Sequence, residues 1–354
     1  MSATESDTDT DRAGATPRLQ LRPGAQVFVV SADELQIVAV NHSTTFTSAP
    51  VVGIVQALIE ALADAPTRGE LGARVAEATG ELGALVDYVA ELMIGTGCVV
   101  SRGAEGPLAE LDPRGEFYAA LGLDPDAIRE ALAAALPIVV APGPSAAQIK
   151  GALAAVGIEG AVIEAEVGAP CGQALDALRA ALDDARGPIV AWDVPWRMPF
   201  ARLLNGVAIE RERPILFGVC EGAVGRLGPY VIPKNTPCLE CVQTRVLANA
   251  GDDEIRIAES YRARLGDAVP PPLPAHPAFR AAIANLLAIE LSQIVLMRPP
   301  VTLGGYVEYT YGGVGARRHP ALKVPRCPAC HPMRPQRLAW NARFPAPLVK
   351  SGSV

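Results

Sequence analysis

Four cysteines stand in two pairs whose spacing is typical of metal chelation. Cys238 and Cys241 form one Cys-x-x-Cys pair, and Cys327 and Cys330 form the other. Two such pairs supply the four thiolates of a closed tetrahedral zinc site, because two intervening residues let both sulfurs of a pair reach one ion. The pairs are too far apart for a zinc ribbon, so the ion would join distant segments of one domain. We therefore predict structural zinc bound by all four cysteines.

Other uses of the cysteines compete with this prediction. A redox dithiol is the main alternative, although the sequence has two pairs and neither begins a helix after an early strand. His331 follows Cys330 and is an alternative ligand. The remaining three, Cys98, Cys171 and Cys220, stand alone in apolar surroundings, which predicts buried thiols.

The stretch 138-IVVAPGPSAAQIKG-151 has the layout of a phosphate-binding strand, turn and helix. Glu164 stands near the position of a ribose-binding acid in a dinucleotide fold. The glycine pattern is nevertheless incomplete. Ser145 and Gln148 replace the glycines needed for close backbone approach and helix packing, and Pro144 removes a backbone donor. We expect a packed strand-turn-helix without a bound nucleotide, so ATP is not predicted as a cofactor of this chain.

Catalytic patterns are scarce elsewhere. None of the four histidines accompanies a serine or cysteine in a nucleophile elbow. Asp193 ends a predicted strand at the edge where open α/β sheets bind ligands, and Arg197 and Arg202 follow it. These residues form either a remnant ligand site or a helix N-cap with surface arginines. No catalytic residue is predicted.

Composition and charge limit the range of functions. The chain has 354 residues, a formal net charge of −7 and 50% hydrophobic residues, which suffices for two domains. Its pI is about 5.3. Lysines and arginines are scattered, which argues against a nucleic-acid partner. The N-terminus is polar and acidic, unlike a signal peptide, and no uninterrupted run of about eighteen apolar residues occurs. We therefore expect a cytoplasmic protein without a membrane partner.

Hydrophobic periodicity divides the chain into two domains. Residues 1–16 are predicted to be a disordered tail. A winged-helix-like module is expected over 17–102, with a capping box at Thr67 and Glu70. Its predicted elements are strands at 26–31, 35–40 and 44–47 and helices at 50–62, 67–78 and 81–97.

A linker at 103–115 is expected to lead into an α/β domain over 116–346, followed by a tail at 347–354. This domain should begin with a helix, a break and a helix over 116–135, with Asp124 as an N-cap. Strands then alternate with helices, which indicates a mostly parallel sheet. The predicted strands are 138–141, 161–166, 188–193, 214–220, 223–233 and 301–310, and the predicted helices are 145–156, 173–185, 199–211 and 278–297.

The order of these parts resembles a known family. The βαβ unit at 138–166, the segment 199-PFARLLNGVAIERERPILFGV-219 and the spacing of the cysteine pairs resemble the ThiF/MoeB family of ubiquitin-activating-enzyme-like adenylyltransferases. The match covers roughly 116–346. The N-terminal strands and helices resemble a RiPP recognition element, the winged-helix module that binds the leader of a ribosomally made precursor peptide. Together they resemble the ThiF-like partner proteins of azoline and thiopeptide cyclodehydratases.

The resemblance implies an α+β winged-helix-like N-terminal module followed by an α/β Rossmann-like ThiF/MoeB-type domain with a structural zinc site. It also implies a role in which the chain holds a precursor peptide for a YcaO-type enzyme. That partner would use ATP and perform the cyclodehydration of Cys, Ser and Thr residues, so this chain would be a non-catalytic subunit. A homodimer is a further assembly that the prediction leaves open.

The leader is expected to add as a strand beside 43–47, with the last helix of the module as the other wall of the cleft. The predicted peptide-binding residues are Ser43, Thr44, Thr45, Phe46, Thr47, Leu85, Val89 and Leu92.

Two alternative functions remain open at this stage. An adenylyltransferase of the same fold would bind ATP, but Val194 and Pro195 stand where the family's Asp-Asn would follow Asp193. A winged-helix regulator would bind DNA with strong salt dependence, although the third helix is acidic at Glu81, Asp87 and Glu91.

Overall fold

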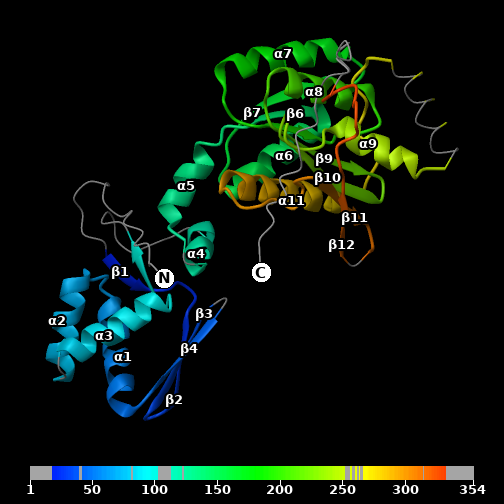
Figure 1. Cartoon of the computed structure of the whole chain (residues 1–354). Helices are drawn as coiled ribbons and strands as arrows, with labels where there is room; N and C mark the ends of the chain where they lie inside the picture. Colours follow the sequence, from blue (N-terminus) through cyan, green and yellow to red (C-terminus); the bar gives the residue numbers. More distant parts are fainter. Residues whose placement is uncertain are drawn as a thin grey trace, which may run out of the picture. The chain divides into compact units, whose positions relative to one another are not determined.

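The computed structural model describes residues 18–331, apart from positions 40–41, 81–82, 103–112, 122, 252–255, 257–259, 261–262, 264–265 and 314. The chain forms two compact units, Met1–Ala131 and Leu132–Val354 (Figure 1). The predicted tails at 1–16 and 347–354 lie outside the described residues, as does most of the predicted linker. The predicted domain limits at 102 and 116 stay predictions, since the compact units meet between residues 131 and 132.

The first part of the N-terminal unit, from β1 to β5, combines two small sheets with the helices α1, α2 and α3. The first sheet has the order β2-β3-β4, and all its pairs are antiparallel. β1 and β5, which the sequence patterns did not predict, pair antiparallel in a second sheet. The elements are β1 (Arg18–Leu21), β2 (Gln26–Ser31), β3 (Glu34–Ala39), β4 (His42–Thr47), α1 (Ala49–Leu62), α2 (Arg68–Thr79), α3 (Gly83–Gly95) and β5 (Val99–Arg102).

The core of this unit lies between the helices and one face of the three-stranded sheet. Leu35, Ile37 and Phe46 contribute from the sheet, and α3 contributes Val86, Val89 and Met93. The predicted capping box at the start of α2 is present, with Thr67 and Glu70 bonded reciprocally. Hydrogen bonds to Thr67 lower the pKa of the Glu70 carboxyl.

Two short helices follow, α4 (Pro113–Ala120) and α5 (Pro125–Ala133). They match the predicted pattern of helix, break and helix. Asp124 accepts a hydrogen bond from the backbone N–H of Asp126 at 2.9 Å, which supports the start of α5 as expected.

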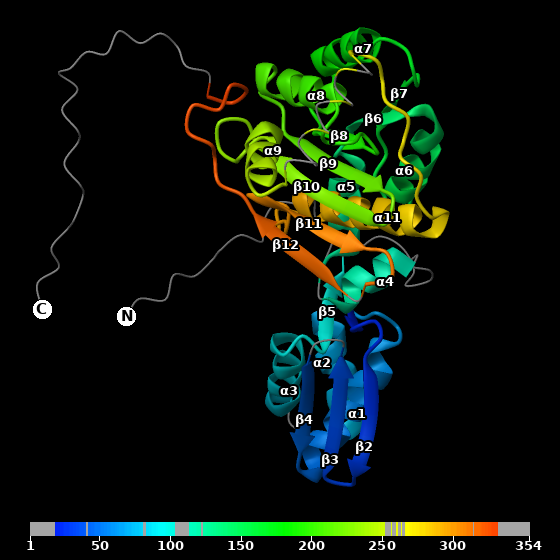
Figure 2. The ribbon, with the colours of Figure 1, turned by 90° about the vertical axis from the view of Figure 1, so that its right-hand side faces the viewer.

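The C-terminal unit is built on a seven-stranded sheet with the order β12-β11-β10-β9-β8-β6-β7 (Figure 2). The neighbouring strands β7, β6, β8 and β9 are parallel to one another. Strands β10, β11 and β12 extend the sheet beyond β9 in antiparallel pairs. The sheet is therefore mixed. Its strands are β6 (Ile138–Pro142), β7 (Ala161–Ala165), β8 (Ile189–Trp192), β9 (Ile215–Glu221), β10 (Val224–Val231), β11 (Gly305–Thr310) and β12 (Ala316–Pro320).

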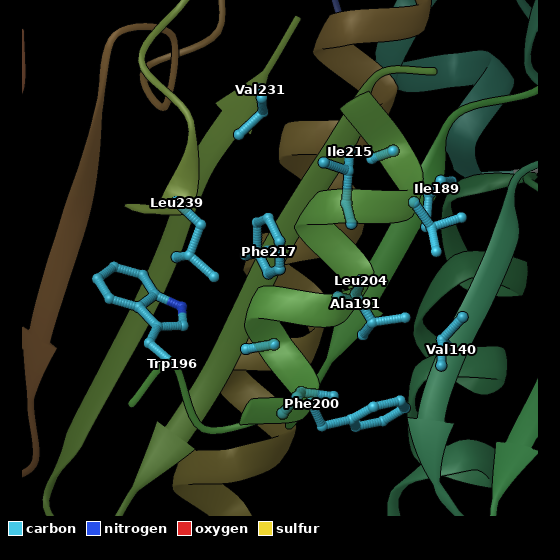
Figure 3. Packing of buried hydrophobic residues seen from close by; sticks show 14 of the residues in the cluster. Val140, Ile189, Ala191, Trp196, Phe200, Leu204, Ile215, Phe217, Val231 and Leu239 are labelled. Carbon is cyan, nitrogen blue, oxygen red and sulfur yellow. The ribbon is translucent and has the colours of Figure 1, made fainter. Parts of the chain in front are cut away.

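Helices cover this sheet on both faces. On one face, α8 lies over the parallel strands, and Phe200 and Leu204 pack on Ala191 and Phe217 (Figure 3). On the other face, α11 lies against β10 so closely that a Cβ at Gly225 would come within 2.4 Å of Ile283. The helices are α6 (Gly143–Val156), α7 (Cys171–Asp184), α8 (Pro199–Glu210), α9 (Leu239–Ala248) and α11 (Pro277–Val295).

By length and composition, α11 is the one described helix that could cross a membrane. Its position in the fold explains the apolar sequence, because Leu287 and Leu291 are buried in the core. Its two charged residues also have partners within the unit. Arg280 pairs with Asp193, and Glu290 accepts hydrogen bonds from the backbone N–H and the hydroxyl of Thr302.

Candidate functional site

The four predicted zinc ligands come together in the C-terminal unit. Cys238 is the N-cap of α9, and Cys241 lies in the first turn of that helix. Cys327 and Cys330 lie in a turn that follows β12. All four sulfur atoms lie within 4.8 Å of one another. The fold thus joins two segments that are far apart in the sequence, as the spacing predicted.

The distances between the sulfurs suit a tetrahedral metal site. Cys238 Sγ lies 3.8 Å from Cys241 Sγ and 3.7 Å from Cys327 Sγ, and Cys241 Sγ lies 3.6 Å from Cys330 Sγ. Four thiolates at about 2.3 Å from one zinc ion would be about 3.8 Å apart. A disulfide would need about 2.05 Å. The arrangement therefore fits a metal ion and does not fit a pair of disulfides.

The surroundings also favour a cation among the thiols. Cys238, Cys241 and Cys327 are fully buried. Burial raises the pKa of the Cys330 thiol to about 11, and it also raises the pKa of the Cys238 thiol. Burial opposes ionisation of Cys241 too, but hydrogen bonds from the Val324 N–H and neighbouring thiols outweigh it and lower its pKa. Four thiolates would need a metal ion to balance their charge here. The alternative ligand His331 is exposed, and it is not among the clustered side chains.

The strand-turn-helix at β6 and α6 has no loop in which a phosphate could sit. The helix begins at Gly143, two residues earlier than predicted, and its N-cap is Pro142. Ser145 is 1% exposed, and its hydroxyl donates to Asp193 Oδ2 at 2.5 Å. The position that would hold a glycine in a nucleotide cradle therefore carries a buried side chain bonded to Asp193, the residue directly after the neighbouring strand β8.

Asp193 is held by three donors from three parts of the unit. Besides Ser145, Arg280 Nη1 donates to Oδ2 at 2.7 Å and the Cys220 N–H donates to Oδ1 at 3.3 Å. The carboxylate is 0% exposed, and burial raises its pKa while the three donors lower it. Asp193 has φ of 57°, a left-handed conformation that aspartate tolerates better than most residues. The three bonds offset the cost of that conformation.

The alternative interpretation of Asp193 as a helix N-cap is wrong, because α8 begins later and its N-cap is Met198. The predicted arginines also lie apart from the carboxylate. Arg202 pairs with Glu240 on α9, and Arg197 lines a separate pocket. Arg280 was missed by the sequence patterns, since it lies far along the chain in an apolar helix.

The Asp193 cluster bridges the place where open α/β sheets bind nucleotides. β7 lies on one side of β6 and β8 on the other, so the chain reverses direction across the sheet between β6 and β8. Ligands usually enter the crevice beyond the carboxyl ends of those two strands. Ser145 follows β6 and Asp193 follows β8, so their hydrogen bond spans this crevice. The buried side chains of Ser145 and Asp193 thus occupy the crevice between β6 and β8.

A pocket of about 180 Å³ lies beside α9 and the strands β10 and β11. Its central charge is Arg226, which donates to Glu308 at 3.0 Å and also pairs with Glu221. The Arg226 guanidinium lies 5.7 Å from the centre of the Trp196 ring. Burial raises the pKa of Glu221, although Arg226 and Arg197 oppose the shift. Two carboxylates hold Arg226, so its charge is already neutralised. The sequence patterns did not predict this pocket.

The predicted peptide-binding residues divide into exposed and buried sets. β4 is an edge strand among the described strands, and Ser43, Thr45 and Thr47 are exposed on it. Phe46 and Val89 are 2% and 1% exposed and belong to the core of the N-terminal unit.

On α3 the exposed flank is partly apolar. Leu92 is 38% exposed, Leu85 is half-buried, and Tyr88, which was not predicted, is 65% exposed. These residues follow one another at helical spacing, whereas Asp87 points towards Gly72 of α2. The three apolar residues therefore lie on the flank of α3 that faces away from α2.

No protein-family model matches the sequence, and no curated protein sequence matches it. Solved structures do resemble its fold, among them two heterocyclase structures and MccB. The heterocyclase TruD has a TM-score of 0.65 and 19% identity, over 89% of this chain and 43% of TruD. A heterocyclase in complex with substrate and cofactor has a TM-score of 0.64 and 19% identity, over 89% of this chain and 40% of that one.

MccB of E. coli, in a structure with AMPCPP and selenomethionine MccA, has a TM-score of 0.58 and 11% identity. That match covers 88% of this chain and 99% of MccB. At these identities the likeness concerns the fold. The chain spans less than half the length of the two heterocyclases, whereas it corresponds to nearly the whole of MccB.

Proposed function

We propose that the protein binds the leader of a ribosomally made precursor peptide and presents Cys, Ser or Thr residues of its core to a YcaO-type cyclodehydratase. The observation that carries the proposal is that β4 is an edge strand among the described strands, in a chain whose fold resembles heterocyclases. An edge strand offers unpaired backbone groups to an extended peptide. The N-terminal unit would thus be the RiPP recognition element, and the leader would form its next strand.

The flank of α3 would supply the second wall of the peptide cleft. Leu85, Tyr88 and Leu92 are the partly or largely exposed apolar side chains on that flank. Phe46 and Val89 would support the cleft from beneath, because their side chains are buried. The leader would be recognised by backbone pairing with β4 and by apolar side chains at alternate positions.

The cyclodehydration itself would belong to a partner chain. The match to TruD covers 43% of that protein, and we assign the cyclodehydration chemistry to the YcaO-type partner. Holding the peptide would raise the effective concentration of its side chains at the partner's active site, up to about the millimolar range for a short link. The complex would work in the cytoplasm, and structural zinc at the four cysteines would stabilise the C-terminal unit.

An adenylating function is the second candidate, since MccB has been solved with ATP and with AMPCPP. The bonds of Asp193 with Ser145 and Arg280 argue against it, because they fill the place that a nucleotide would need. Measurable ATP binding would favour this candidate over presentation to a partner.

Fluorescence anisotropy of a labelled leader against the full chain tests leader binding. Strand addition uses every second amide of the peptide. N-methylation at one set of alternate positions should therefore weaken binding about fivefold per lost hydrogen bond, and N-methylation of the other set should not. Equal effects at all positions would contradict strand addition.

Protein variants test the second wall of the cleft. Leu92→Asp should weaken leader binding by about tenfold, whereas Ala73→Asp on the exposed surface of α2 should not. A DNA duplex at moderate salt is measured in parallel. Tight duplex binding without leader binding would favour a winged-helix regulator.

A further inference from the structure

The pocket beside α9 is lined by charged side chains that balance one another. They are two arginines and two glutamates, Arg197, Arg226, Glu221 and Glu308. Arg226 pairs with both glutamates, and the charge of Arg197 also stabilises the Glu221 carboxylate. An anionic ligand would face the two glutamates, and a cationic ligand would face the two arginines. The pocket therefore favours a neutral ligand.

Two buried polar atoms of the lining have no hydrogen-bond partner among the residues that the structure describes. They are Trp196 Nε1, which is a donor, and Gln243 Oε1, which is an acceptor. Both residues are 5% exposed. Buried polar groups in proteins are normally hydrogen-bonded, because an unpaired one has lost its water without replacement. A ligand that brings one acceptor and one donor would satisfy both atoms.

The orientation of the Gln243 amide is set by the backbone. Its Nε2 donates to the Trp196 carbonyl. Turning the amide over would place Oε1 against that carbonyl oxygen, which would bring two acceptors into contact. The Trp196 indole, for its part, can only donate. The lining thus offers one acceptor and one donor whose roles cannot be exchanged.

The size and the walls of the pocket suit a short planar group. Its volume of about 180 Å³ is below the roughly 300–1,000 Å³ of pockets that hold drug-sized ligands. At roughly 30 Å³ for each water-sized group, it has room for about six non-hydrogen atoms. Tyr306 packs edge-on against the Trp196 ring, with 4.9 Å between the ring centres, and Val246 and Leu247 of α9 also line the pocket.

A glutamine or asparagine side chain has this size, and its planar carboxamide carries an acceptor and a donor side by side. A serine hydroxyl also donates and accepts, but it would leave most of the volume unfilled.

We propose that this pocket binds a primary carboxamide, the side chain of a glutamine or asparagine in a peptide. The carboxamide oxygen accepts from Trp196 Nε1, and its nitrogen donates to Gln243 Oε1. A peptide residue is favoured over the free amino acid, because Arg226 and both glutamates are already paired and leave no charge for an ammonium and a carboxylate. The pocket lies within the C-terminal unit, so the inference does not rest on leader binding at β4.

Titrations of the full chain at neutral pH, followed by saturation-transfer NMR, test the chemistry of the ligand. The probes are N-acetyl-L-glutamine methylamide, its glutamate analogue and free L-glutamine. The blocked glutamine should bind at least about tenfold more tightly than the glutamate analogue, whose carboxylate cannot donate to Gln243 and faces Glu221 and Glu308.

Equal binding of the two blocked compounds, or no binding of the blocked glutamine, would overturn the proposal. Tighter binding of free L-glutamine than of the blocked compound would overturn its assignment to a peptide. These comparisons use the unmodified protein, so they hold whether or not a variant folds.

Two tryptophan variants locate the site. Trp196→Phe removes Nε1 and keeps an aromatic ring, so it should weaken binding of the blocked glutamine about fivefold. Trp192→Phe is the matched control. Trp192 is 0% exposed and its Nε1 also lacks a described partner, but its ring lies with Leu287 beside Gly218, on the face of the sheet that α11 covers.

Trp192→Phe should therefore leave binding of the blocked glutamine unchanged. Circular dichroism melts establish that each variant is folded at the temperature of the titration. Binding by folded Trp196→Phe that equals binding by the wild type would overturn the proposal, as would equal losses in the two variants.

Discussion

Removing Arg280 should destabilise the protein more than neutralising Asp193, although the two residues form one ion pair. Arg280 is 16% exposed in its side chain, whereas the Asp193 side chain is 0% exposed. In Arg280→Met the carboxylate loses its counterion in a site that water cannot reach. In Asp193→Asn the guanidinium loses its counterion but keeps some contact with water and its hydrogen bond to the Leu273 carbonyl.

The magnitudes follow from the burial of each partner. An uncompensated buried charge costs about 3–5 kcal/mol, which we expect for Arg280→Met. Asp193→Asn keeps an acceptor for the Cys220 N–H and can donate its amide to the Ser145 hydroxyl, so it should cost about 1–3 kcal/mol. For a unit of this size, each kcal/mol shifts Tm by about 2–4 °C.

The two variants should also differ in their response to pH. Burial already raises the pKa of Asp193, and loss of Arg280 removes a contribution that lowers it. A carboxyl whose folded pKa lies above its unfolded value gains stability as the pH falls. Arg280→Met should therefore recover stability as the pH falls towards the unfolded pKa of aspartate, about 3.9, and Asp193→Asn should not.

Thermal and urea unfolding followed by circular dichroism at several pH values measure both effects. The reasoning is refuted if Arg280→Met is as stable as Asp193→Asn, or if lowering the pH gives Arg280→Met no advantage over it.

Three further predictions follow from the same structure. Protein purified without chelator should contain one zinc ion per chain. Cys238→Ser should lower both the zinc content and the solubility of the protein. A metal-free protein as stable as the zinc-bound form would contradict the prediction of a structural zinc site. Calorimetry with ATP and magnesium should show negligible binding, and a dissociation constant in the low micromolar range would favour the adenylating candidate. Val89→Glu should lose more than about 3 kcal/mol of stability, since it buries a charge, whereas Leu92→Asp should melt close to the wild type. Equal melting of the two variants would place Val89 in the cleft.

Hydrophobic periodicity located most helices and strands because each long element repeats its apolar residues over several turns or alternations. The strands that the sequence patterns did not predict are either short or rich in charged residues. β1 and β5 have four residues each, and β12 carries Arg317 and Arg318. Such segments become strands through their partners in the sheet, and no local pattern marks them.

The candidate sites divide in the same way. The cluster of four cysteines could be predicted because Cys-x-x-Cys encodes the local geometry of each half. The surroundings of Asp193 could not, since its partner Arg280 reaches it from another helix. On α3, helical spacing identified an apolar stripe but not its orientation. Packing of α3 against α1 and α2 decides that Val89 is buried and that Tyr88 is exposed.

Reconstituted heterocyclisation tests the central claim most directly. A YcaO-type enzyme and its precursor peptide are incubated with ATP, with and without this chain, and the loss of one water per azoline is followed by mass spectrometry. We predict that the chain accelerates the reaction of a precursor that carries its leader and has little effect on the core peptide alone. Equal rates with and without the chain, or equal acceleration of the leaderless core, would contradict the account.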